Sequence, residues 1–195
     1  MNMTIPAKPQ TFVGISRNQR IPFRDFSTLN AGDRGIGETK VNGEEINLFK
    51  VLMQHPKLAR SWAPFANYII NEQTLPARER EILILRIGWL NQAQYEWEQH
   101  VLMGKNAGLT DDEIDRITKG PKAGWDRHHA ALIQAADDLF ENSTVSDATW
   151  QTLSARYNTE QMIDAVFTIS QYNLVSWVLN SFGVPLDDFL LDAKK

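Results

Sequence analysis

The sequence predicts an all-α protein, with a helical domain of about eight helices that follows an irregular N-terminal arm. No segment alternates polar and apolar residues with the two-residue period of a strand. From residue 44 onward, apolar residues recur at helical spacing between residues that favour helix ends. Residues 82–90, ILILRIGWL, are apolar on nearly every side, which is typical of a buried helix. The 195 residues, 43% hydrophobic and 23% charged, suit one globular domain with an appended arm.

Residues 1–43 differ from the rest of the chain and form the expected arm. They contain three prolines and five glycines, and their apolar residues show little helical spacing. Ile5, Phe12 and Phe26 are nevertheless apolar, and disordered tails usually lack such residues. We therefore expect the arm to lie against the helical domain, which spans residues 44–195.

The ends of the expected helices follow from prolines, glycines and an asparagine. A proline can open a helix because its missing N–H would have no partner there, and Pro56 and Pro76 are placed this way. Asn91 can end one helix and precede the next, and Gly108 and Gly183 end two others. The expected helices cover residues 44–54, 56–71, 76–90, 92–107, 110–118, 126–141, 147–157 and 158–181.

Side-chain caps are expected at three helix starts. Thr110 with Glu113 is a capping box, in which each side chain bonds the other residue's backbone N–H. Asn158 with Gln161 repeats this pattern, and Ser146 is placed to cap the helix that follows it.

Composition and charge exclude several classes of function. The net charge is -4, and acids and bases are mixed along the chain. Surfaces that bind nucleic acid or anionic membranes need clustered Lys and Arg, so we expect neither partner. The absence of cysteine excludes disulfides, thiolate nucleophiles and cysteine–metal sites. The apolar stretch 162–184 contains Asp164 and three amide side chains, a load that a bilayer span of about 20 residues rarely carries. The polar N-terminus has no apolar signal-peptide core, so we expect a cytoplasmic protein.

Two ionisable residues of the helix at 92–107 are expected on its buried side. At about 100° per residue, Gln94, Glu98 and Lys105 share the solvent side. Glu96 and His100 lie on the other side, and their i,i+4 spacing places the carboxylate and the imidazole within reach of each other. Such a pair can exchange a proton near neutral pH. The alternative is an ordinary salt bridge or a hydrogen-bonded core histidine.

We expect no cofactor and no metal site. One Glu-x-x-x-His pair offers only two ligands. His128 and His129 point about 100° apart on a helix, so they cannot share a metal, and we place them at the surface or at a helix cap. The sequence has neither a phosphate-binding glycine loop nor a nucleophile elbow. A metal-dependent hydrolase remains an alternative class, which metal analysis of the purified protein would test.

The stretch LPAREREILILRIGWLNQAQYEWEQHVLMGKNAGLTDDEI resembles the core of the carboxymuconolactone decarboxylase family, which includes the AhpD-type alkylhydroperoxidases. The resemblance continues through AALIQAADDLF, VSDATWQTLSARY and QMIDAVFTISQYNLVSWVLNSFGVPL and covers about residues 46–187. It implies an all-helical fold in which a helical hairpin carries the active site. It also implies a homo-oligomer, a trimer or hexamer, with a dimer-based assembly as the alternative.

The peroxidase branch of this family carries the pattern Glu-x11-Cys-x2-Cys-x3-His. The corresponding residues here read Glu81-x11-Ala93-x2-Glu96-x3-His100, so both cysteines are replaced. Thiol-based peroxide reduction is therefore excluded, because neither thiolate exists.

Tyr95, Glu96, Trp97 and His100 resemble the pattern of the cysteine-less decarboxylase branch. The resemblance implies cofactor-free decarboxylation, or a related proton transfer, on a small organic acid or lactone. Such chemistry needs a group that stabilises an enolate-like charge and an acid that returns a proton. His100 and Glu96 are the candidates, and Glu81 would hold His100 or relay the proton.

Further side chains are expected to bind the substrate. Arg86 could take a substrate carboxylate, or it could be paired within the protein or lie at the rim of the buried region. Tyr95, Trp97 and Tyr172 are candidates for the walls of the site, and Tyr172 could instead be a hydrogen-bonded core residue. We therefore predict a homo-oligomeric enzyme that resembles a cofactor-independent carboxy-lyase. The alternative is a non-catalytic oligomer of the same fold that binds a small ligand or serves as a scaffold.

Overall fold

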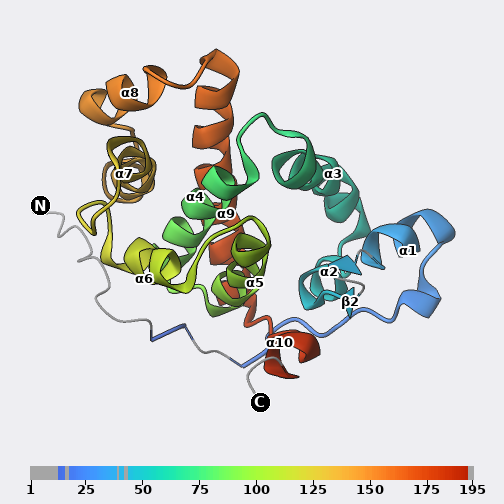
Figure 1. The fold of residues 1–195 in the computed structure, drawn as a ribbon. Coiled ribbons are helices and arrows are strands. Elements are labelled where there is room, and N and C mark those ends of the chain that lie inside the picture. The colour runs from blue at the N-terminus through green and yellow to red at the C-terminus, as the bar shows by residue number, and fades with distance from the viewer. Residues whose placement is uncertain (1–12, 16–17, 39, 42–43, 193–195) are drawn as a thin grey trace, which may run out of the picture. The chain divides into compact units, whose positions relative to one another are not determined.

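The structure is a computed structural model that describes residues 13–15, 18–38, 40–41 and 44–192 (Figure 1). The chain divides into two compact units. The first comprises Met1–Ile15 and Gln73–Trp177, and the second comprises Ser16–Glu72 and Val178–Lys195. All of the predicted site residues lie in the first unit.

The first unit is organised around α4 (Ala77–Leu90), which packs against three other helices. These three are α5 (Gln94–Asn106), α6 (Asp111–Lys119) and α7 (Arg127–Asn142). Further along the chain, α7 packs against α8 (Asp147–Ser154), and α9 (Thr159–Phe182) runs largely within this unit. Every residue from 81 to 90 of α4 is buried, which confirms the buried helix predicted from the apolar run.

The second unit contains shorter elements. They are η1 (Phe26–Thr28), α1 (Ala31–Gly37), β1 (Lys40–Val41), β2 (Glu44–Glu45), α2 (Asn47–Leu52), α3 (Pro56–Asn67), the π-helical turn η2 (Tyr68–Glu72) and α10 (Asp188–Asp192). β1 and β2 form a two-residue antiparallel pair. The Asn47 backbone N–H donates to Asp187 Oδ1 at 2.6 Å, which joins α2 to the segment before α10. Leu29, Met53 and Ala59 form a small buried cluster.

The all-α prediction is confirmed. Ten α-helices are found among the described residues, and eight of them have seven residues or more. The predicted helices at 76–90, 92–107, 126–141 and 158–181 match α4, α5, α7 and α9 within a few residues. Within the described ranges, no helix combines the length and the apolar character that a bilayer span requires.

The arm is more ordered than predicted, because it contains α1. Three glycines in this segment weaken its helical propensity, so its sequence gave little sign of a helix. The Asn30 side chain caps α1 by accepting the Asp33 N–H, and Asp33 pairs with Arg60 of α3. A Cβ at Gly37 would lie 2.8 Å from the Phe26 ring, so close packing requires glycine there. Tertiary contacts thus outweigh propensity in this helix.

Two of the three predicted caps are confirmed. Thr110 and Glu113 form the capping box, and Asn158 and Gln161 bond each other's backbone N–H groups. The predicted Ser146 cap is wrong in its bonding. Ser146 does precede α8, but its hydroxyl donates to Asp138 Oδ2 at 2.7 Å and caps no N–H of the helix. A hydrogen bond to a carboxylate is stronger than one between neutral groups, so the Ser146 hydroxyl donates to Asp138 of α7 instead of accepting an N–H of α8.

Candidate active site

A tight helical hairpin, α4 to α5, carries the candidate site. Gln92, in the turn, adopts a left-handed φ of 52°, which few residues other than glycine take. Its side-chain Oε1 accepts the Val13 N–H at 2.7 Å, and its carbonyl oxygen accepts the Ile15 N–H at 3.0 Å. A Cβ at Gly88 would lie 3.6 Å from Glu96 Cγ, so the two helices approach closely here. The hairpin therefore sets a buried face of α4 against the inner face of α5.

Glu81, Glu96 and His100 meet between these two helices. Glu81 Oε2 lies 2.7 Å from His100 Nδ1, and Glu96 Oε1 lies 2.9 Å from His100 Nε2. The exposed fractions of Glu81, Glu96 and His100 are 0%, 4% and 5%. The structure thus brings together the three residues that the sequence singled out as catalytic candidates, and it places the imidazole between the two carboxylates.

The two contacts of the imidazole differ in geometry. The Nδ1 contact with Glu81 is an aligned hydrogen bond. Glu96 Oε1 lies close to Nε2, but among the described residues no donor is aligned with this buried oxygen. The second contact is therefore an ion pair rather than a directed hydrogen bond. One ring nitrogen of His100 is fixed by Glu81, and the proton on the other is held less tightly.

The carboxylates keep His100 positively charged. Burial by itself lowers the pKa of His100, but the charges of Glu81 and Glu96, together with the hydrogen bond to Glu81, outweigh it and raise the pKa to about 10. At neutral pH both ring nitrogens therefore carry a proton. Nδ1–H donates to Glu81, and Nε2–H faces Glu96.

Tyr172 of α9 borders the same cluster. Its ring meets the His100 ring edge-on, with centroids 4.8 Å apart. Burial, with the negative charges of Glu96 and Glu81, raises the pKa of Tyr172 well above its usual value. The phenol is therefore neutral and can donate a hydrogen bond.

Arg80 is a member of this cluster that the sequence did not indicate. Its Nε and Nη2 both donate to Glu81 Oε1 at 3.1 Å, and its side chain is 14% exposed. Adjacent residues of a helix do not face each other, so their spacing carries no signal of such a contact. The contact is possible because the arginine side chain is long and flexible.

The structure does not bring Arg86 into the cluster. Arg86 Nε donates to Asp137 Oδ1 at 2.7 Å, and Nη1 donates to the carbonyl oxygens of Ile117 and Thr118. Gly120 closes the other side, since a Cβ there would lie 3.2 Å from Nη2. The buried arginine thus pins α4 to α6 and α7. Its role in binding a substrate carboxylate stays a prediction.

Tyr95 and Trp97 flank Glu96 in the sequence but point elsewhere from it. Tyr95 is buried, and Trp97 is half-buried and packs on Trp89 with ring centroids 5.4 Å apart. Their role as substrate-binding residues stays a prediction.

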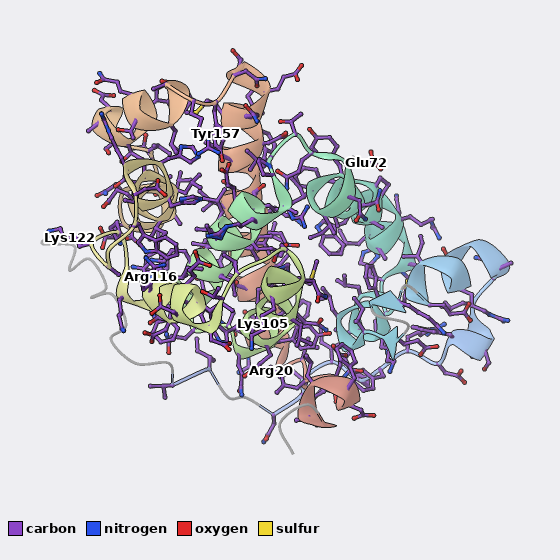
Figure 2. The ribbon with its side chains drawn as sticks, viewed as in Figure 1. Arg20, Glu72, Lys105, Arg116, Lys122 and Tyr157 are labelled. Carbon is purple, nitrogen blue, oxygen red and sulfur yellow. The ribbon has the colours of Figure 1, made fainter. Side chains whose placement is uncertain are left out.

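The outer side of α5 is less open than predicted. Lys105 is exposed (Figure 2), but Gln94 and Glu98 are partly buried. At Gln94 the arm accounts for the difference, because Gly14 packs against its side chain, with the Cβ position 3.4 Å away.

The two neighbouring histidines have different surroundings. His129 lies in the first turn of α7, where its ring and backbone N–H both contact the cap residue Asp126, as the prediction of a cap residue expects. His128, predicted at the surface or a cap, turns inward with a side chain only 10% exposed. Its Nε2 lies 3.5 Å from Glu79, whose carboxylate accepts a hydrogen bond from the Tyr157 hydroxyl.

No group of three or more His, Asp or Glu side chains within the described ranges has the arrangement of a metal site.

Comparisons with known proteins agree with this geometry. Residues 56–137, which contain the hairpin, match the model of the Carboxymuconolactone decarboxylase family. No curated protein matches the chain. Its fold is similar to several solved structures, of which three are described. The first is an AhpD-core, uncharacterized peroxidase-related protein from Ralstonia eutropha JMP134, with 20% identity, a TM-score of 0.78, and 88% of this chain and 94% of that chain covered.

The second is a protein of unknown function from Agrobacterium tumefaciens, with 18% identity, a TM-score of 0.65, and 70% of this chain and 94% of that chain covered. The third is an uncharacterized peroxidase-related protein from Silicibacter sp. TM1040, with 12% identity, a TM-score of 0.64, and 72% and 78% covered. At these identities the structural similarity shows the fold alone, so the chemistry has to be argued from the residues of the site. Residues 56–137 therefore match the carboxymuconolactone decarboxylase family, the fold is AhpD-like, and the sequence contains no cysteine.

Proposed function

We propose that the protein catalyses cofactor-independent proton transfer, most simply a decarboxylation, on a small carboxylated or lactone substrate. One observation carries the proposal. An imidazolium is fixed at Nδ1 by a buried carboxylate, and its Nε2–H faces a second carboxylate without an aligned hydrogen bond. An oriented imidazole with one ring nitrogen free to exchange its proton is the arrangement that general acid–base catalysis requires.

In the proposed reaction, His100 supplies the one proton that replaces the carboxylate of the substrate. The bond between the substrate and its carboxylate breaks, carbon dioxide leaves, and the bonding electrons form an enolate. His100 Nε2–H then gives its proton to the enolate carbon. The neutral imidazole recovers a proton from solvent by way of Glu96, and Glu81 keeps the ring in place throughout.

Two electrostatic features support this assignment. The raised pKa, about 10, keeps His100 loaded with its proton at neutral pH. A substrate that displaces Glu96 from Nε2 removes one of the charges that raise this pKa, so binding makes His100 a stronger acid. The neutral Tyr172 phenol can donate to the developing enolate oxygen, where a fixed donor stabilises a transition state.

The alternative function is ligand binding or scaffolding without chemistry. The charges of Arg80, Glu81, His100 and Glu96 sum to zero, and this balance is also what a purely structural ion-pair cluster requires. In that case the cluster would stabilise the hairpin, and no bound molecule would react.

A turnover assay separates the two functions. The protein is incubated in deuterated water with a panel of small carboxylated lactones and unsaturated acids, and carbon dioxide release and deuterium incorporation at carbon are followed. We expect turnover by the wild type, with a loss of about a hundredfold or more in Glu96→Gln and His100→Gln. Lys105→Gln, an exposed position on the same helix, is the matched control and should leave turnover unchanged.

Turnover that survives both substitutions would overturn the proposal. Ligand-dependent melting shifts without turnover of any panel member would favour the binding alternative. Loss of turnover on removal of a stoichiometric metal ion would favour a metal-dependent hydrolase.

A further inference from the structure

We propose that Ser176 of α9 binds the substrate by donating its hydroxyl hydrogen to an oxygen atom remote from the carbon that His100 protonates. This inference rests on the proposed function. It narrows the substrate to a small acid that carries a second oxygen group about one helical turn from the first.

Ser176 has a buried hydroxyl group without a partner. The residue is 0% exposed, and its Oγ makes no hydrogen bond to any described residue. A serine hydroxyl within a helix can donate to the carbonyl oxygen four residues earlier, and Ser176 does not do so. Leaving a buried hydroxyl unpaired costs folding free energy. A ligand that completes the hydrogen bond accounts for this cost.

Three buried residues of α9 lie four residues apart, so they share one side of the helix. The first is Thr168, which is also 0% exposed, and its hydroxyl donates to Gln73 Oε1 at 3.2 Å. The second is Tyr172, whose ring meets the His100 ring edge-on. The third is Ser176. The protein thus supplies a partner for the hydroxyl at Thr168 and supplies none at Ser176.

Contacts of Asn91 place Ser176 beside the turn of the α4–α5 hairpin. Asn91 Nδ2 donates to Asn173 Oδ1 at 2.8 Å, and Asn91 Oδ1 accepts Trp177 Nε1–H at 2.9 Å. Ser176 lies between these two contacts along α9, whereas Tyr172 lies just before them. Ser176 is therefore level with the hairpin turn.

Glu96 stands at the same end of the hairpin, in the first turn of α5. Its Oε1 is buried and has no aligned donor among the described residues, as is the case for Ser176 Oγ. The carboxylate faces Nε2 of His100, the atom that meets the substrate once Glu96 is displaced. A substrate that reacts at His100 and reaches Ser176 would lie along this end of the hairpin.

Tyr172 and Ser176 together define the class of substrate. Residues four apart on a helix have Cβ atoms about 5–6 Å apart. In the proposed reaction the neutral Tyr172 phenol donates to the enolate oxygen, so Ser176 would bond a second acceptor about one turn away. A carbonyl, carboxylate or ring oxygen fits this role. An analogue that lacks this oxygen would leave the buried hydroxyl unpaired and should bind more weakly.

The test compares two probes of equal chain length, 4-oxopentanoate and pentanoate, which differ in one carbonyl group. Their dissociation constants are measured by calorimetry for the wild type and for Ser176→Ala. We expect the wild type to bind the oxo acid about tenfold more tightly than pentanoate. Ser176→Ala should lose most of this preference and bind pentanoate as the wild type does.

Thr168→Val removes the partnered hydroxyl from the same side of α9 and is the matched control. It should keep the wild-type preference for the oxo acid and lower the melting temperature, because it removes a buried hydrogen bond. Without ligand, Ser176→Ala should melt at or above the wild-type temperature, because it removes a group that has no partner.

A wild type that binds the oxo acid no better than pentanoate overturns the inference, and so does a Ser176→Ala variant that keeps the preference. A Ser176→Ala variant that melts well below the wild type also contradicts it, because the hydroxyl would then be bonded within the protein, for instance through an internal water.

The two proposals can fail separately. These measurements follow binding, so the proposed reaction can fail for lack of turnover while the role of Ser176 holds. Turnover that Ser176→Ala leaves unchanged would instead remove Ser176 from the site and leave the proposed reaction standing.

Discussion

His100 keeps its positive charge in a place where burial alone would remove it. Burial lowers its pKa, and Glu81 and Glu96 more than reverse this and raise it to about 10. Because the folded value lies above the usual value of 6.5 for histidine, the charge stabilises the folded state at low pH. That contribution is complete below about pH 6.5 and is lost as the pH rises through about 10.

The first prediction concerns the pH dependence of stability. The free energy of unfolding of the wild type should fall by several kcal/mol between about pH 7 and pH 10. In this range His100 stays protonated in the folded protein but is neutral in the unfolded chain, so folding requires the uptake of a proton that becomes scarcer as the pH rises. Chemical denaturation at a series of pH values measures this. His100→Gln should lack that part of the slope, whereas His129→Gln, at a partly exposed cap, should retain it. Equal slopes in the wild type and His100→Gln would refute the proposed charge state.

Single residues also show how far the sequence can be interpreted. Helical spacing alone predicted that Glu96 and His100 face inward together, because i,i+4 contacts lie within one helix. The partner of Arg86 could not be predicted, since Asp137 lies 51 residues further along the chain. A buried arginine with no visible partner therefore suggested a ligand site, when its true partners were a carboxylate and two carbonyls.

At the scale of elements, two polar junctions tie helices of the first unit to one another. Arg86 joins α4 to Asp137 of α7 and to the end of α6. Asp138 of α7 receives the backbone N–H and the hydroxyl of Ser146, which precede α8. The Arg86 junction holds α4, the helix that carries Glu81, in place.

The second prediction is that Arg86 acts on stability. Arg86→Met should lower the free energy of unfolding by about 3–5 kcal/mol, because it leaves the buried Asp137 without its cation. Arg86→Met with Asp137→Leu should recover part of the loss, and a thermodynamic double-mutant cycle measures the recovery. If Arg86→Met instead leaves stability intact and abolishes only substrate binding, the original expectation of a carboxylate-binding arginine is right.

The third prediction separates the two partners of the α7–α8 junction. Ser146→Ala should cost about 1 kcal/mol, because Asp138 still accepts the backbone N–H of residue 146. Asp138→Ala should cost roughly 2–3 kcal/mol, because it leaves several donors without an acceptor. Urea denaturation of both variants provides the comparison. A larger effect at Ser146 would point to a helix cap after all.

At the scale of the whole molecule, α9 presents an apolar stripe to solvent. Ile163, Phe167, Leu174 and Trp177 are each close to half exposed, and their spacing places them on one side of the helix. Exposed apolar stripes of this kind are typical of protein–protein contacts. We expect the stripe to be covered by a second copy of the chain, in line with the predicted homo-oligomer.

The fourth prediction follows from this stripe. The wild type should sediment as an oligomer, and Phe167→Asp should shift it toward smaller species, because a charge would be buried in the contact. Val13→Asp changes a more exposed apolar residue outside the stripe and should leave the assembly unchanged. A wild type that is monomeric at all concentrations would remove the basis for an oligomer on this face.

The helices of the first unit were largely predictable, because each carries its own apolar spacing and its own termini. The second unit was less so. α1 is rich in glycine and depends on Asp33 pairing with Arg60, and α10 is only five residues long. Short elements that rely on distant partners leave little local signal in the sequence. The pairing of Arg80 with Glu81 could not be predicted either, because it depends on how the arginine side chain lies in the folded protein.

The central claim is that His100 is an imidazolium held between two carboxylates, and NMR of ring-labelled histidine tests it most directly. The His100 signals are identified by their absence in His100→Gln. The account predicts that both ring nitrogens are protonated at neutral pH, with no titration between about pH 5 and 8 and deprotonation near pH 10. A His100 that titrates near its ordinary value of 6.5, or that carries a single proton at neutral pH, would contradict it.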